Sequence, residues 1–423
     1  MFDRLHPDVL DKILLSMPDF QTLSAALRTS RTHFYSVFQA HPKSIVLSIA
    51  YNVVGPALPQ AVRVVCQADP NLCDEDAILA DHALDRDACE DLQLNAATVQ
   101  RLEHLFSLRH KDRSSATSRL TPDESFRFRR AVYRLWLYCE RVRADSEENP
   151  SAYTHLLDSW PAHELLEMDR VAVFLKDVAS WSFVSGTEWP ERWDRIPPNT
   201  HFMRGPAAVL RDWEDAVSPD DQLEFNPGVS VNLDEQLHEI RQKRNLKSGD
   251  SYTADRAKAI VDAAIGAEDR CHRCHTPKGL DLWGRPKWHI LRGFLSVPCM
   301  INLLEGKLPR NDHEISPLAD YIHARDDDDD RLTFDWTNFI EELCEMDVDA
   351  EGPWDTNQWY CFDCLLALVR LRLREWWIAT KVKEGMPINE NCWYGYNCRT
   401  QVHRPAHRSK LNHLCTPTRG DPA

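Results

Sequence analysis

The sequence lacks most of the signatures of nucleotide-dependent, acyl-transfer and metal-hydrolytic enzymes. Only 14 of its 423 residues are glycine, too few to favour the glycine-rich loops that hold phosphates. It contains no Gly-x-Ser-x-Gly, no Walker loop, no Gly-x-Gly-x-x-Gly and no His-Glu-x-x-His. From these absences we expect a chain that is not an enzyme.

Long apolar stretches and sheet-like alternation are also missing. Charged side chains interrupt the first residues, so no secretory signal is expected and the cytosol or nucleus is the predicted location. The longest uncharged run, 44–62, contains Asn, Gly, Pro and Gln in its second half, which indicates a buried helix followed by a turn and no membrane partner. Period-two alternation is absent, so the predicted fold is mainly α.

The charge balance argues against nucleic acid as a partner of the whole molecule. Asp and Glu number 66 against 50 Lys and Arg, a formal net charge of −16, whereas phosphate binding needs clustered cations. The segment 365–423 differs, because it holds 10 Lys and Arg against 4 Asp and Glu. A local anionic partner therefore stays open for this tail.

The first forty residues predict a pair of short amphipathic helices. Apolar residues recur with helical spacing before Pro18 and again after Thr22, and either Thr22 or Asp19 can cap the second helix. Two such helices cannot bury their apolar stripes alone, so they must pack on each other, on the next helix or on a partner. The stripe residues of the first helix are Leu5, Val9, Leu10, Ile13, Leu14 and Met17.

This segment resembles the F-box. The matching stretches are Leu5-His6-Pro7-Asp8-Val9-Leu10-Asp11-Lys12-Ile13-Leu14, Met17-Pro18-Asp19-Phe20-Gln21-Thr22-Leu23 and Leu27-Arg28-Thr29-Ser30-Arg31-Thr32-His33-Phe34. The resemblance implies docking of the Skp-type adaptor of cullin ubiquitin ligases through an exposed apolar face. The alternative is a three-helix cap on the following domain. The implied partner-binding residues are Leu5, Pro7, Leu10, Ile13, Leu14, Pro18 and Leu23.

Three regions follow from these patterns. We expect a three-helix F-box-like module at 1–45, a helical domain at 46–265 and a small, irregular, Cys/His-rich zinc-binding region at 266–423. Within the middle region the periodicity predicts helices near 124–143, 162–178 and 233–244. Thr121 is the predicted cap of the first of these, with Pro122 at its first position.

Cysteine placement points to metal chemistry near the C-terminus. Nine of the 13 cysteines lie between Cys271 and Cys415, and in a reducing compartment thiols in pairs indicate metal ligands. Two Cys-x-x-Cys motifs, at 271–274 and 361–364, predict one four-cysteine zinc site across an 86-residue insertion. The alternatives are two unrelated cysteine pairs, or mixed sites with His272, His275 or His289. The predicted ligands are Cys271, Cys274, Cys361 and Cys364.

The final segment is the densest in ligand types. Cys392 and Cys398 are predicted to bind zinc together with two residues from His407, His413 and Cys415, with His403 left as a spectator. A structural zinc ion here would substitute for an apolar core. Gly395 is expected to make a tight turn with positive φ between the first two ligands.

This cluster resembles the poly(ADP-ribose)-binding zinc finger, on Cys392-Trp393-Tyr394-Gly395-Tyr396-Asn397-Cys398-Arg399 and the later pair His407 and His413. The wider string is also similar to the C-terminal signature of fungal F-box-like proteins. The leading hypothesis is a non-catalytic adaptor that presents an unknown target to a cullin-type ubiquitin ligase. The others are a nuclear, zinc-dependent module for poly(ADP-ribose) or another polyanion, and a scaffold alone.

Overall fold

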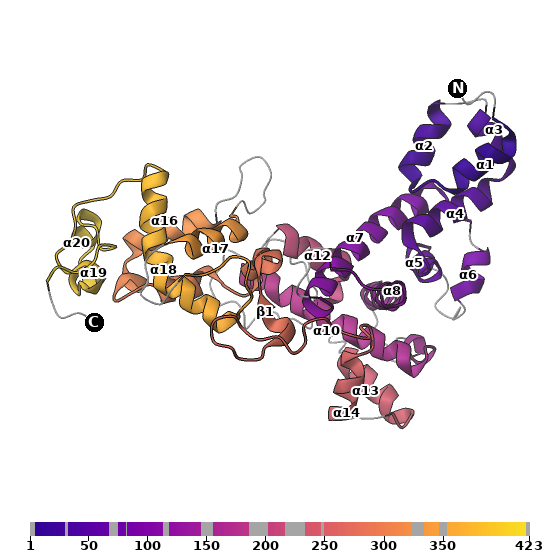
Figure 1. Ribbon diagram of the computed structural model, residues 1–423. Coiled ribbons are helices and arrows are strands. Elements are labelled where there is room, and N and C mark those ends of the chain that lie inside the picture. The colour runs from indigo at the N-terminus through magenta and orange to yellow at the C-terminus, as the bar shows by residue number, and fades with distance from the viewer. Residues whose placement is uncertain are drawn as a thin grey trace.

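The computed structural model describes residues 5–29, 33–66, 75–81, 83–112, 118–144, 155–185, 202–215, 233–246, 249–323, 334–346 and 353–419. Helices dominate these ranges, and the strands among them are two residues long, which confirms the prediction of a mainly α fold with a Cys/His-rich C-terminal cluster. The chain runs from an N-terminal helical module at one end of the molecule to a yellow C-terminal segment at the other (Figure 1).

The N-terminal module consists of short helices packed on one another. Pro7 opens the first helix, and the His6 side chain accepts a hydrogen bond from the backbone N–H of Asp8 at 3.4 Å. The side chain of Asn52 ties the module together, because it donates to the carbonyl oxygens of Leu15 and Met17, both at 2.9 Å. The helices are α1 (Pro7–Leu15), α2 (Phe20–Thr29), α3 (His33–Ala40) and α4 (Pro42–Val54).

The apolar stripe of α1 faces inward. Leu10 and Leu14 are 2% and 0% exposed, because α1 packs against α3 and α4, and Leu23 of α2 is also buried. These three side chains therefore lie in the core and not on the exposed face that the sequence predicted for them. The predicted residues on the surface are Leu5, Pro7 and Pro18, while Ile13 is half-buried.

The predicted boundary after residue 45 falls inside α4. Ile45 is fully buried near the start of this helix, which packs both on α1 and on the long helix α7. The N-terminal module is thus joined to the middle region by a continuous helix. The predicted division into a module that ends at residue 45 and a domain that begins at residue 46 stays a prediction.

The middle region is built on three long helices. Thr121 and Glu124 form a capping box at the start of α8, in which the Thr121 Oγ1 accepts from the Glu124 N–H at 3.3 Å and Glu124 accepts from the Thr121 N–H at 2.9 Å. The predicted cap at Thr121 is thereby confirmed. The helices are α5 (Leu58–Val65), α6 (Glu75–Asp81), α7 (Arg86–His110), α8 (Pro122–Ala144), α10 (Ala162–Ser185), η3 (Phe202–Arg204), α12 (Pro206–Asp215), α13 (Leu233–Lys243) and α14 (Asp250–Ala257).

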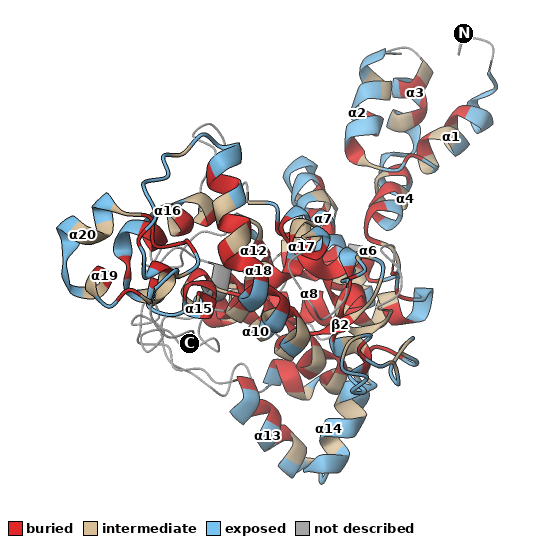
Figure 2. Cartoon of the chain, turned by 60° about the vertical axis from the view of Figure 1, so that its left-hand side comes forward, coloured by how far each residue is buried: buried red, intermediate tan, exposed pale blue. Residues whose placement is uncertain are grey.

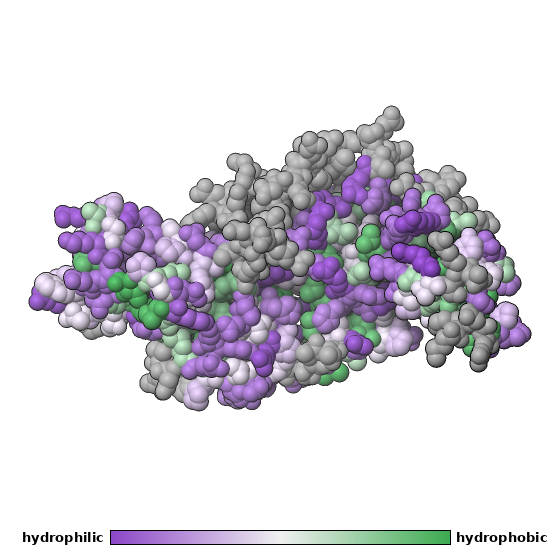
Figure 3. All heavy atoms as spheres, turned by 90° about the horizontal axis from the view of Figure 1, so that it is seen from above, coloured by the Kyte–Doolittle hydropathy of each residue, from purple (hydrophilic) through white to green (hydrophobic). Residues whose placement is uncertain are grey.

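The interior of this region is apolar, and its surface is mixed. Buried residues line the inner faces of α8 and α10, as the red ribbon in Figure 2 shows. Seen from above, the described residues are mostly hydrophilic, with hydrophobic ones in small groups (Figure 3). In the described ranges no single helix is long and apolar enough to cross a bilayer. Taken together, α4 and α5 have the length and composition of a membrane span, but the pair is bent by 105°.

The C-terminal region combines a small sheet with helices. β1 (Leu282–Trp283) pairs antiparallel with β2 (Tyr360–Cys361), so that Leu282 lies opposite Cys361. Immediately after β2, α18 (Phe362–Lys383) begins and runs through a core that contains the buried Trp377. The remaining elements are η5 (Gly279–Asp281), η6 (Arg285–Gly293), α15 (Val297–Leu303), η7 (Leu308–Arg310), α16 (Asp312–His323), α17 (Trp336–Glu345), η8 (Gly395–Asn397), α19 (Thr400–His403) and α20 (Pro405–Lys410).

Candidate metal centres

The β1–β2 pairing brings the two Cys-x-x-Cys motifs together. The backbone N–H of His272, in the first motif, donates to the carbonyl oxygen of Trp359 at 2.9 Å. Trp359 lies directly before β2, so this hydrogen bond adds a second connection between the two motifs. Cys361 ends β2, and Cys364 lies in the first turn of α18. The long insertion between the motifs is thus closed by backbone hydrogen bonds.

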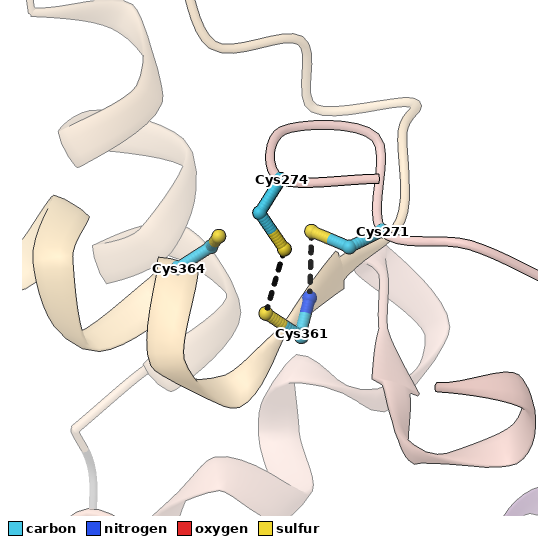
Figure 4. Close-up of side chains that lie close together, drawn as sticks. All are labelled: Cys271, Cys274, Cys361 and Cys364. Carbon is cyan, nitrogen blue, oxygen red and sulfur yellow. Dashed lines mark hydrogen bonds between the residues drawn. The ribbon is translucent and has the colours of Figure 1, made fainter. Parts of the chain in front are cut away.

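The four sulfur atoms converge on one point. They lie within 4.8 Å of one another, and the Cys274 and Cys361 sulfurs are 3.7 Å apart. Two thiolates bound to tetrahedral zinc at about 2.3 Å are separated by about 3.8 Å. Figure 4 shows the two motifs turned toward a shared centre, with Cys271 and Cys274 on the loop. The geometry therefore fits a tetrahedral ion held by Cys271, Cys274, Cys361 and Cys364, which we call the first cluster.

The thiols of the first cluster are in unequal environments. Hydrogen bonds with Thr276 lower the pKa of the exposed Cys274 thiol to about 6. Burial raises the pKa of Cys361 and that of Cys364, and the backbone N–H of Cys361 donates to the Cys271 sulfur at 3.2 Å. A cation at the centre favours all four thiolates, so metal binding releases protons here.

A second cluster forms at the end of the chain, from Cys392, Cys398, His407 and His413. Their ligand atoms also lie within 4.8 Å of one another. The His407 Nε2 atom is 3.4 Å from the Cys398 sulfur and 3.8 Å from that of Cys392. These values bracket the separation of about 3.6 Å expected between sulfur and nitrogen on tetrahedral zinc.

His413 provides an independent test of the fit. Its side chain is fully buried, yet neither ring nitrogen has a hydrogen-bond partner. Burial lowers the pKa of this imidazole, and the neighbouring His407 acts in the same direction. A neutral, buried histidine with no hydrogen bond is costly unless an ion takes up a nitrogen lone pair. The donor set therefore suits zinc.

Cys415 and His403 lie outside the second cluster. The Cys415 thiol donates to the carbonyl oxygens of Cys392 and Asn412, at 3.2 and 3.4 Å. Its thiol thus supports the backbone next to the ligand Cys392. Of the three predicted candidates His407, His413 and Cys415, the two histidines complete the cluster. His403, the predicted spectator, is exposed.

Gly395 adopts the turn that the sequence predicted. Its φ is +42°, and its N–H donates to the Cys392 carbonyl oxygen at 2.9 Å. A Cβ atom at this position would lie 2.0 Å from the carbonyl oxygen of Cys415. Glycine is therefore required both for the backbone conformation and for the close approach of the chain end.

Sequence reasoning missed two buried polar side chains that connect the segment of the second cluster to the residue preceding α16. The Asn311 amide donates to the Gln401 side chain at 2.8 Å, and Gln401 in turn donates to the Tyr396 carbonyl oxygen at 3.1 Å. Both side chains are fully buried. No motif marks such residues, since an isolated Asn or Gln is ordinarily exposed.

With both clusters placed, the chain can be compared with known proteins. It is similar to a ubiquitin ligase. Over 169 residues it is 28% identical to the E3 ubiquitin-protein ligase CHFR of Danio rerio, a match that covers 35% of this chain and 24% of the relative. The match spans only about a quarter of the relative's length. No protein-family model matches the sequence, and no solved structure matches it.

This similarity corrects one prediction. The absence of familiar catalytic motifs led us to expect a chain that is not an enzyme, whereas the relative is by name a ligase and hence an enzyme. Ligation of ubiquitin needs none of the motifs that were sought, so their absence did not bear on it. The comparison supports a relation to ubiquitin ligases, together with Cys/His clusters that suit a metal.

Proposed function

We propose that this chain works in ubiquitin ligation, with its N-terminal module docked on a Skp-type adaptor and the remaining regions selecting a protein target. The observation that carries the proposal is the match to a ubiquitin-protein ligase. The F-box-like sequence of the first helices supports the choice of partner.

The docking surface must come from side chains that the fold leaves outside its core. Leu5, just before α1, and Val9 on α1 are 37% and 43% exposed, and Pro7 between them is also exposed. Pro18 extends the apolar surface at the following turn. Covering such a surface yields about 25 cal/mol per Å² of apolar area, so a partner can bind without any catalytic group.

Zinc has a structural part in this proposal. Each cluster supplies four protein ligands, which leaves no open coordination position for a reacting water. When bound, the ion supplies folding free energy to segments with small cores. The residues that would hold it are Cys271, Cys274, Cys361 and Cys364 in the first cluster and Cys392, Cys398, His407 and His413 in the second.

Co-purification with a Skp-type adaptor tests the proposal. Val9→Asp places a charge on the exposed face of α1 and is expected to weaken binding at least tenfold without unfolding the module. Leu94→Asp is the matched control, because Leu94 is 68% exposed on α7 and its replacement leaves α1 intact. The proposed docking is refuted by an adaptor that fails to bind the wild-type chain, or that binds the Val9→Asp variant equally well.

A second candidate function rests on the surface of the second cluster. Arg399, Arg404 and Lys410 are exposed around the ligands, and Trp393 and Tyr394 are 60% and 50% exposed beside them. Cations with accessible aromatic rings suit a polyanion that carries bases, such as poly(ADP-ribose).

The polyanion candidate predicts binding that falls steeply with salt and is lost in the double variant Arg399→Ala/Arg404→Ala. Binding independent of salt would exclude it. We further propose a cytosolic or nuclear location, because thiols arranged as metal ligands suit a reducing compartment.

A further inference from the structure

A small apolar pocket opens between α10, α13 and α14, and none of its lining residues is a ligand of either metal cluster. Its volume is about 200 Å³, below the roughly 300–1,000 Å³ of sites for drug-sized ligands. Leu165, Leu237 and Leu246 contribute apolar walls. The size and lining suit a single bulky apolar side chain.

One wall of this pocket is a weakly packed helix. None of the residues of α14 is buried, and Figure 2 shows the helix exposed or half-buried along its length. It is held by Tyr252, whose hydroxyl donates to the buried Asp169 carboxylate at 2.5 Å. The α14 wall of the pocket is therefore made by exposed or half-buried residues that one hydrogen bond ties to α10.

Two charged side chains border the apolar walls. The guanidinium of Arg241 stacks on the Tyr252 ring, 3.9 Å from its centroid. Among the described residues no carboxylate lies within ion-pair distance of Arg241. Arg241 also shares a hydrogen bond with the Tyr252 hydroxyl, and its remaining N–H groups are suited to a planar anion. Asp255 also lines the pocket.

We propose that this pocket binds the C-terminal residue of a protein partner when that residue is bulky and apolar. A chain end supplies an apolar side chain for the leucine walls and a carboxylate for Arg241. An internal residue lacks the carboxylate. The site goes beyond the proposed ligase role and does not depend on it, although under that role it would select targets by their last residue.

Peptide binding to the full chain tests the assignment. The probe is a fluorescein-labelled hexapeptide, Gly-Ser-Gly-Ser-Gly-Leu, with a free C-terminal carboxylate, and binding is followed by fluorescence anisotropy. It is expected to bind at least tenfold more tightly than the same peptide with an amidated end, and than one that ends in Ala. Arg241→Gln should abolish the preference for the free acid while leaving the helices folded.

Two further variants separate the pocket from the rest of the surface. Leu237→Trp fills the cavity and should weaken the Leu peptide at least tenfold, whereas Leu94→Trp on α7 should not, with helicity by circular dichroism checked for both. The assignment is overturned if acid and amide bind equally, if the Arg241→Gln variant keeps the preference, or if no peptide binds. None of these outcomes involves the Skp-type adaptor, so they are distinguishable from failure of the docking proposal.

Discussion

The guanidinium of Arg374, in the middle of α18, donates a hydrogen bond to the backbone carbonyl oxygen of Leu414 at 2.8 Å. Its Nε atom pairs with Glu305 at 3.1 Å, and its guanidinium carbon lies 4.9 Å from the Tyr396 ring centroid. Since α18 begins at the second Cys-x-x-Cys motif, one helix contacts both metal clusters. The rigid placement of the second cluster thus depends on this helix.

Arg374→Met is expected to loosen the second cluster. It leaves the Leu414 carbonyl without its donor, a loss of about 1–3 kcal/mol for a buried acceptor. Hydrogen exchange should rise in 392–415 and change little in α8 and α10. Arg370→Met is the matched control, because Arg370 is exposed on the same helix. Equal exchange in the two variants would contradict the assigned role of Arg374.

Chelation of the metal is expected to act locally. The helices of the middle region have their own apolar core, so helicity by circular dichroism should fall only slightly after treatment with a strong chelator. Hydrogen exchange should rise around the ligands, in 266–281, 353–364 and 390–419. Global unfolding on chelation, or unchanged exchange in these segments, is the outcome that this account does not allow.

Gly395→Ala is expected to disrupt the second cluster more than an ordinary glycine replacement does. The added Cβ would meet the Cys415 carbonyl oxygen at 2.0 Å, and φ is +42°. Gly385 is a matched control with φ of +66° and nothing within 4 Å of an added methyl group, so Gly385→Ala should cost about 1 kcal/mol. Urea unfolding measures both, and similar losses would show that the close approach is unimportant.

The buried carboxylate of Glu75 predicts a loss of stability in acid. Burial alone would raise its pKa, but two hydrogen bonds from Arg134 at 2.9 Å, with Gln60 and Arg63 nearby, bring it below the ordinary value. Because the pKa is lower in the folded state, this stabilisation is present above about pH 4.3, the ordinary value for Glu, and is lost as the pH falls further.

Glu75→Gln should therefore lower stability at pH 7 by about 3 kcal/mol, since it removes the carboxylate beside the buried Arg63 and one of the two carboxylates that pair with Arg134, and should flatten the decline in acid. Glu90→Gln is the control, because Glu90 pairs with Arg86 on the exposed side of α7. Urea midpoints at pH 7 and in the acid range compare the variants. An acid decline as steep in Glu75→Gln as in the wild type would refute the role of this carboxylate.

Local signals in the sequence were reliable where local chemistry decides the structure. Thr121 caps the helix that it was expected to open, and Gly395 has the positive φ that its turn required. Such features depend on a few neighbouring residues. They survive whatever the remainder of the chain does.

Features that depend on distant parts of the chain were not predictable in detail. The first cluster closes through strands of two residues, too short to give any periodicity. Periodicity also identified Leu10 and Leu14 as apolar without showing whether a partner or the chain itself covers them, and here α3 and α4 do. Similarly, composition offered Cys415 as a ligand, and only the fold directs its thiol to backbone carbonyls.

The number of zinc ions per chain, measured by native mass spectrometry, tests the central claim most directly. Two ions are expected in the wild type, and one in each of Cys361→Ser and His413→Ala. Cys299→Ser and His403→Ala alter a cysteine and a histidine outside the clusters, and should retain two ions. A wild-type chain purified without chelator that carries no zinc, or single variants that keep both ions, would contradict the account of two converging metal sites.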